Sequence, residues 1–159
     1  MIRKLARLSL LTALGLLAAW LEATLLPSPG VPGVKLGLAN LFTVVALYRY
    51  GWREAAYVTL ARVALSALLF GSLSSLMYAV SGAALAVPGM ALCKRARRFS
   101  CVGVSIAGGV LHNLGQLGAA VIVAQTPGLS AYLPVLLVAG AVTGLVNGLL
   151  ADVLIKRFP

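Results

Sequence analysis

Residues 76–98 read LMYAVSGAALAVPGMALCKRARR, and this stretch decides the fold. Its first part, residues 76–92, carries no charged side chain, whereas KRARR follows almost at once at residues 94–98. An uncharged apolar run close to 20 residues long suits a helix that crosses the hydrocarbon layer of a membrane. A basic cluster beside such a helix is typical of its cytoplasmic end. The stretch therefore predicts a membrane-spanning helix that ends in the cytoplasm.

The composition of the whole chain indicates the same environment. Of the 159 residues, 61% are hydrophobic and only 10% are charged, whereas soluble domains average about 25% charged residues. So few charges cannot cover a soluble globule, and the apolar surface must face lipid. At about 20 residues per crossing, the length allows six crossings. We therefore expect one membrane domain over residues 1–159.

Five further apolar runs lie before and after residues 76–92. The run nearest the N-terminus, at about residues 5–26, begins like a signal peptide, but it is longer than a signal core of about 7–15 residues, so we keep it as a helix. Residues 27–35 are rich in proline and glycine and are not expected to be helical. The sequence predicts an all-α integral membrane bundle of six transmembrane helices, at about residues 5–26, 36–48, 55–70, 76–92, 102–124 and 132–155.

The charges predict the orientation of this bundle. If the N-terminus is inside, the outer turns hold Lys35 as their one basic residue. The inner segments hold eleven, which are Arg3, Lys4, Arg7, Arg49, Arg53, Lys94, Arg95, Arg97, Arg98, Lys156 and Arg157. This bias places both termini in the cytoplasm of a multi-pass protein of the cell (cytoplasmic) membrane. Nucleic-acid binders gather basic residues on one folded face, so the net charge of +10 does not indicate nucleic acid as a partner.

Polar side chains inside the apolar runs are the main functional clues, because they are costly in hydrocarbon. His112, Asn113 and Gln116 lie within five residues of each other, at spacings that place them on adjoining parts of one helix surface. We interpret them as a substrate-binding site between helices. The alternative is that they hydrogen-bond neighbouring helices together. His112 is the one histidine, so we expect no metal site.

Four more polar residues extend the candidate site. Glu22 lies near the outer end of the first helix, and Lys35 and Asn40 follow the loop of residues 27–35. Glu22 and Lys35 either pair at the membrane interface, which contributes little energy, or bind a ligand. Asn147 lies beside a helix face that carries glycines and could complete a polar pocket.

The remaining intramembrane features have structural interpretations. Gly140, Gly144 and Gly148 recur every four residues, a spacing that lets helices pack closely. Asp152 is four residues from Lys156, which predicts an ion pair along the helix. Arg62 lies about 10 Å into its expected helix, and we expect its side chain to extend back to the cytoplasmic surface. The alternative is a role in substrate binding, in which Arg62 and Lys35 would indicate an anionic or phosphorylated group.

No arrangement of residues in the chain predicts catalysis. The GxxxxGK[ST] motif for nucleotides is absent. Diphosphate chemistry on Mg²⁺ needs several converging carboxylates, whereas the only acidic residues are Glu22, Glu54 and Asp152, on three different segments. A Ser-His-Asp arrangement is equally implausible. We expect no catalytic residue, cofactor or enzymatic activity, but a protein that binds and passes a small molecule.

Two segments carry a family resemblance. GVKLGLANL at residues 33–41 and HNLGQ at residues 112–116 resemble the bacterial Gx transporter family, also described as heptaprenyl diphosphate synthase component I. The likeness covers nearly the whole chain. That family resembles, in turn, the S components of energy-coupling factor (ECF) transporters, which are six-helix membrane subunits that capture substrates.

The resemblance implies partners and roles. S components work with a transmembrane coupling protein and two cytoplasmic ATPases, and small residues of their first helix contact the coupling protein. Ser9 and Ala13 match that position, and residues 27–35 match the loop that covers the substrate. No set of residues here matches a known vitamin site, so the likeness does not name the ligand. Prenyl synthases use aspartate-rich Mg²⁺ sites, which this chain lacks.

Three functions remain open from the sequence. The first is the substrate-binding subunit of an ECF-type importer. The second is an accessory membrane subunit of heptaprenyl diphosphate synthesis. The third is a stand-alone secondary carrier, whose proton coupling would need a buried carboxylate, for which Glu22 is a weak candidate.

Overall fold

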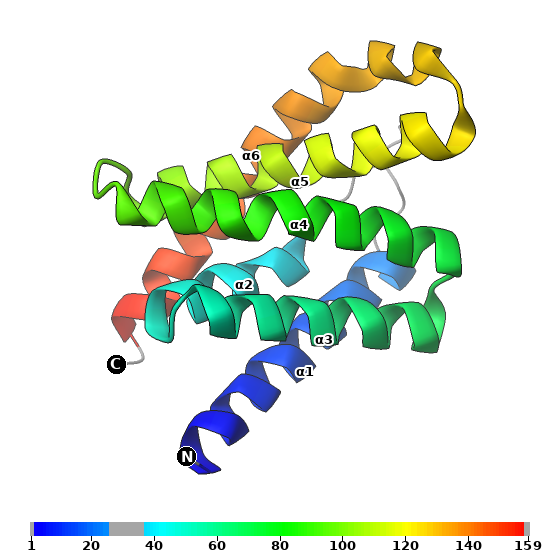
Figure 1. Ribbon diagram of the computed structural model, residues 1–159. Coiled ribbons are helices and arrows are strands. Elements are labelled where there is room, and N and C mark those ends of the chain that lie inside the picture. Colours follow the sequence, from blue (N-terminus) through cyan, green and yellow to red (C-terminus); the bar gives the residue numbers. More distant parts are fainter. Residues whose placement is uncertain (1, 26–36, 158–159) are drawn as a thin grey trace.

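The computed structural model describes residues 2–25 and 37–157, which are helical along almost their whole length (Figure 1). These residues form six α-helices and one short 3-10 helix, and they contain no strand. The apolar runs become helices because a helix satisfies its own backbone hydrogen bonds, which lipid cannot do. The elements are α1 (Ile2–Leu25), α2 (Leu38–Arg49), α3 (Trp52–Phe70), α4 (Leu73–Arg95), α5 (Cys101–Ala124), η1 (Pro127–Tyr132) and α6 (Leu133–Arg157).

The lengths of the helices divide them into two classes. Four segments are long and apolar enough to cross a membrane: α1, α4, α5, and η1 together with α6. The 12 residues of α2 extend about 18 Å, which is less than the hydrocarbon thickness of about 30 Å. The helix α3 carries three charged residues, Arg53, Glu54 and Arg62. Each predicted helix is present, and four have the length and apolar character of a membrane span.

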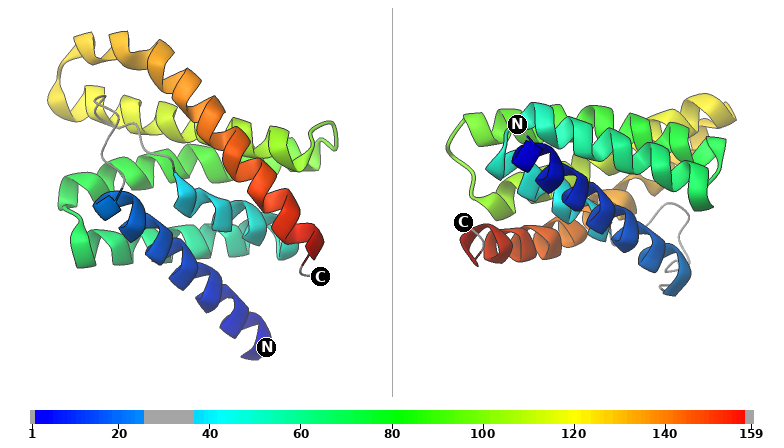
Figure 2. Two further views of the ribbon diagram at one scale, coloured as in Figure 1. Left: turned by 180° about the vertical axis from the view of Figure 1, so that it is seen from behind. Right: turned by 90° about the horizontal axis from the view of Figure 1, so that it is seen from below.

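The bundle consists of two halves (Figures 1 and 2). The N-terminal half is α1, α2 and α3, which contact one another. In the C-terminal half, α5 packs extensively on both α4 and α6. The two halves meet chiefly where α3 contacts α4 and where α2 contacts α6. A space between the halves is therefore bounded by elements from both.

Glycines bring the backbones of α5 and α6 together. A Cβ atom added to Gly144 would lie 2.7 Å from the Ser105 carbonyl oxygen and 2.7 Å from the Ile106 Cα atom. A Cβ atom added to Gly148 would lie 2.7 Å from the Cα atom of Val102. Side chains at these positions would separate the helices, so the predicted packing role of the glycine repeat is confirmed.

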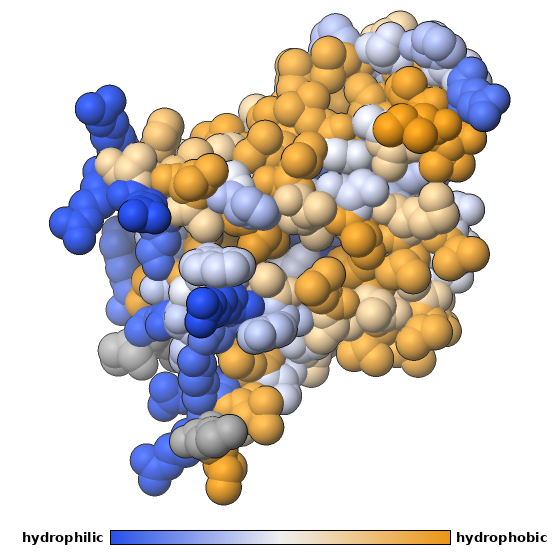
Figure 3. Space-filling model, viewed as in Figure 1, coloured by the Kyte–Doolittle hydropathy of each residue, from blue (hydrophilic) through white to orange (hydrophobic). Residues whose placement is uncertain are grey.

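The buried apolar core, which includes Val44 of α2, Val58 of α3 and Met90 of α4, lies toward the end of the bundle where the basic residues gather. The two described chain ends and the α2–α3 and α4–α5 connections gather there, and Figure 3 shows hydrophilic side chains along it. We call it the basic end. Lys94 donates to the carbonyl oxygen of Leu47 at 2.7 Å, close to where α2 ends. The predicted ion pair of Asp152 and Lys156 is confirmed at 2.6 Å.

Candidate functional site

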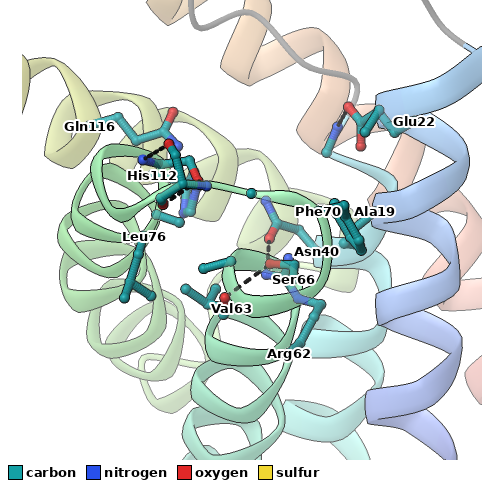
Figure 4. A pocket seen from close by; sticks show the side chains of 18 of the residues that line it. Ala19, Glu22, Asn40, Arg62, Val63, Ser66, Phe70, Leu76, His112 and Gln116 are labelled. Carbon is teal, nitrogen blue, oxygen red and sulfur yellow. Dashed lines mark hydrogen bonds between the residues drawn. The ribbon is translucent and has the colours of Figure 1, made fainter.

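A cavity of about 470 Å³ lies between the two halves, and we call it the central cavity (Figure 4). Its walls come from the last turns of α1, the start of α2, the second half of α3, the start of α4 and the middle of α5, with Thr143 of α6. The segments from α1 to α4 lie in the parts of their helices away from the basic end, and those from α5 and α6 lie near mid-helix. The volume lies within the range of about 300–1,000 Å³ that is usual for small-molecule sites.

Most of the residues that the sequence singled out as substrate-binding line this cavity. Asn147 lines a smaller adjoining space of about 20 Å³, and Lys35 and the predicted covering loop lie outside the described residues. The fold brings together residues from three helices that are distant in sequence. The five predicted residues in the wall of the central cavity are Glu22, Asn40, His112, Asn113 and Gln116.

Glu22 is buried and holds the start of α2. Its Oε1 atom accepts a hydrogen bond from the backbone N–H of Gly37 at 2.7 Å, and 7% of the residue is exposed. A carboxylate is stabilised at a helix N-terminus by the helix dipole. Gly37 has φ 65°, a left-handed conformation that glycine adopts without strain. The proposed pair with Lys35 falls outside the described residues.

Arg62 is a wall residue whose position the sequence analysis predicted wrongly. Instead of extending to the surface, its side chain is buried at 7% exposure, and Nη2 donates to the Oδ1 atom of Asn40 at 3.2 Å. Gly15 makes room for it, because a Cβ atom there would lie 2.9 Å from the Arg62 Cδ atom. The Arg62 side chain is therefore buried against α1 and α2 and does not reach the surface, and Arg62 is part of the candidate site (Figure 4).

The polar residues of α5 divide into two kinds. Asn113 donates from Nδ2 to the carbonyl oxygen of Leu136 at 2.8 Å, so its amide joins α5 to α6, as the structural alternative predicts. The imidazole of His112 packs against Gly82, where an added Cβ atom would lie 2.8 Å from the ring. Among the described residues, the side chains of His112 and Gln116 have no hydrogen-bond partner. They remain available to a ligand.

Three serines in the cavity wall were not predicted as site residues. Ser66 donates to the carbonyl oxygen of Val63 at 3.0 Å. Ser72 and Ser75 cap α4: the Ser72 hydroxyl accepts from the Ser75 N–H at 3.1 Å, and Ser75 Oγ accepts from the Ser72 N–H at 2.8 Å. The capping signal was visible as serines before an apolar run. Its place in the wall depends on the tertiary fold.

The other two carboxylates lie away from the cavity. Glu54 pairs with Lys4, and Asp152 pairs with Lys156, so both are at the basic end. Within residues 2–25 and 37–157, no group of three His, Cys, Asp or Glu side chains is placed to hold a metal ion.

The residues expected to contact a partner lie on the outer surface of α1. Ser9 and Ala13 are exposed, as are their neighbours Leu10 and Leu17, at 58% and 50%. The opposite face of the helix turns inward, where Gly15 is buried. The helix α1 thus presents small and apolar side chains that no described part of the chain covers.

Comparison with known proteins gives one family. A family model described as heptaprenyl diphosphate synthase component I matches residues 11–154, which include every described residue of the candidate site. No curated protein and no solved structure matches the sequence.

Proposed function

Because the chain belongs to the heptaprenyl diphosphate synthase component I family and has a cavity with polar side chains between its halves, we propose that it captures a small molecule within the membrane. In this proposal it is the substrate-binding subunit (S component) of an ECF-type importer. A coupling protein and two ATPases supply the energy, and the chain itself performs no chemistry.

The single observation that carries the proposal is the position of the central cavity relative to the basic end. Eleven basic residues gather at the opposite end from most of the cavity wall. Under the positive-inside rule, the basic end faces the cytoplasm, with all six helices in the membrane and both termini inside. The cavity then lies in the outer part of the membrane, as capture from outside requires.

The exposed face of α1 supports the choice of an importer subunit. Ser9 and Ala13 leave a shallow surface on which another helix can approach closely. A coupling protein that docks there would reach the N-terminal half of the bundle, and with it one side of the cavity. The match to S components in this region comes from the resemblance of the sequence.

The test is co-expression with a coupling protein and its two ATPases, followed by purification and uptake in proteoliposomes. We expect the four proteins to co-purify and uptake to require ATP. Ala13→Trp should abolish co-purification, whereas Val138→Trp, at a position on α6 that is 65% exposed, is the matched control and should not. Uptake by the chain alone would favour a stand-alone carrier, and absence of both co-purification and ATP-dependent uptake refutes the proposal.

The family description favours a second candidate, an accessory subunit of heptaprenyl diphosphate synthesis. In this role the chain would deliver an isoprenoid precursor to a soluble catalytic partner, since its carboxylates do not converge. Addition of the purified chain in nanodiscs to such a partner should raise prenyltransferase activity. Unchanged activity counts against this role and leaves the importer proposal intact.

A further inference from the structure

Arg62 is the one lysine or arginine in the wall of the central cavity among the residues that the structure describes. It is more than nine-tenths buried, and Figure 4 shows it extending toward Asn40 below the cavity. The other described lysines and arginines lie at the basic end, where water and headgroups can solvate them. The charge of Arg62 therefore needs a partner inside the bundle.

The described residues accept only one hydrogen bond from the guanidinium group of Arg62. The guanidinium group has five N–H donors, and a single hydrogen bond, to Asn40 Oδ1 at 3.2 Å, joins it to the described residues. The Nε atom is buried without a partner. The nearby carboxylate of Glu22 acts on this charge electrostatically, but N–H donors of the guanidinium group are left without a hydrogen-bond acceptor, which is unfavourable for a buried charged group.

Glu22 does not neutralise Arg62 by contact. Both residues line the cavity, but the ion pairs among the described residues are those of Lys4 with Glu54 and of Lys156 with Asp152. Glu22 accepts instead from the Gly37 N–H. The cavity thus has a carboxylate on α1 and an incompletely paired guanidinium on α3, without a direct bond between them.

We propose that the ligand of the central cavity carries an anionic group, a carboxylate or a phosphate, which Arg62 binds. This names the substrate class of the proposed importer and rests on that function. Guanidinium groups match both anions in geometry and form strong charge-assisted hydrogen bonds with them. Asn40 orients the guanidinium through its amide oxygen, and Gly15 leaves the space that the arginine stem occupies. The uncharged part of the ligand contacts His112 and Gln116.

The experiment titrates the purified chain in phosphatidylcholine nanodiscs with potassium phosphate and with potassium acetate, against potassium chloride at equal ionic strength. Tryptophan fluorescence reports binding. Arg62→Gln should raise the apparent Kd for the anion about tenfold or more, since a hydrogen bond to a charged group contributes about 1.5–3 kcal/mol. Arg53→Gln is the matched control. It removes a charge beside Trp52 at the basic end and should bind as the unaltered chain does.

A second measurement keeps the inference testable if Arg62→Gln folds poorly. Arg62→Lys keeps the charge but loses the planar donor group, and it should bind the anions with intermediate affinity. Nanodiscs that contain phosphatidylglycerol identify the source of the anion. If phosphatidylglycerol weakens the binding of added phosphate, the site is assigned to a lipid headgroup. If phosphate binds equally well with and without phosphatidylglycerol, the site is assigned to a soluble molecule. Native mass spectrometry gives the mass of any species retained by the unaltered chain and lost from Arg62→Gln.

Equal affinity of the unaltered chain and Arg62→Gln overturns the inference, as does failure of the unaltered chain to bind either anion. These outcomes are separable from failure of the importer proposal. ATP-dependent uptake of an uncharged ligand would refute the anion site and leave the importer standing. Anion binding that depends on Arg62, without uptake or co-purification of partners, would support the anion site and refute the importer.

Discussion

Replacement of Gly144 by alanine should loosen the C-terminal half of the bundle. The added Cβ atom would lie 2.7 Å from the Ser105 carbonyl oxygen and the Ile106 Cα atom, whereas ordinary contacts begin at 3.4 Å. The backbones of α5 and α6 must therefore separate by about 0.7 Å, the difference between 3.4 and 2.7 Å. Both obstacles are backbone atoms, which cannot rotate away. Overpacking of this kind costs about 1–3 kcal/mol.

Gly118→Ala is the matched control for this prediction. Gly118 is also on α5, but no described atom lies within 4 Å of a Cβ atom added there. Each substitution gains the same helix propensity, up to about 1 kcal/mol, so the difference between them isolates the contact. Unfolding by sodium dodecyl sulfate, followed by circular dichroism, should show Gly144→Ala to be less stable than Gly118→Ala by about 1–3 kcal/mol. Equal stability would refute the backbone contact between α5 and α6.

Three further predictions concern the buried polar contacts and the orientation. Thr43 and Thr59 share a buried hydrogen bond of 2.8 Å, so Thr43→Val alone should lower the free energy of unfolding by about 1–3 kcal/mol. In a double-mutant cycle, replacing both threonines by valine should lower it by less than the sum of the two single changes. Additive costs would show that the hydroxyls do not interact. Glu22→Ala should reduce stability in the same unfolding assay more than Glu22→Gln does, because glutamine can still accept from the Gly37 N–H; equal losses would contradict this role. In intact cells, an impermeant maleimide should label Gly128→Cys, in a chain whose own cysteines are replaced by serine, and should not label the native Cys93 and Cys101. The opposite labelling would reverse the proposed orientation.

The helices could be predicted from the sequence because each apolar run is bounded by charges, prolines or glycines. The candidate site could be predicted in part for a related reason. A polar residue such as His112 or Gln116 within an apolar run can be recognised from the sequence, whichever helix it contacts. The Asp152–Lys156 pair and the glycine repeat depend on spacing along one helix, and both are present as predicted.

The position of Arg62 could not be predicted in this way. Whether an arginine extends to the surface or stays buried depends on its neighbours, and here these are Gly15 of α1 and Asn40 of α2. Ser66 was missed because a serine can bond to its own helix, as it does to the carbonyl of Val63. Because such a hydroxyl has a hydrogen-bond partner within its own helix, the sequence gives no reason to place it in a binding site. Both cases concern contacts between helices, whereas sequence patterns report mainly on single helices.

The division into two halves has a mechanical consequence. The C-terminal half, in which α5 packs closely on α6, contacts the N-terminal half chiefly where α3 meets α4 and where α2 meets α6. One apolar core joins the two halves toward the basic end. Because this core holds the halves together, a relative movement of the halves would change the width of the space between them mainly at the end where the central cavity lies. The distance from α1 to α5 is therefore a gauge of how far the molecule is open, and a pair of spin labels on those two helices would measure it.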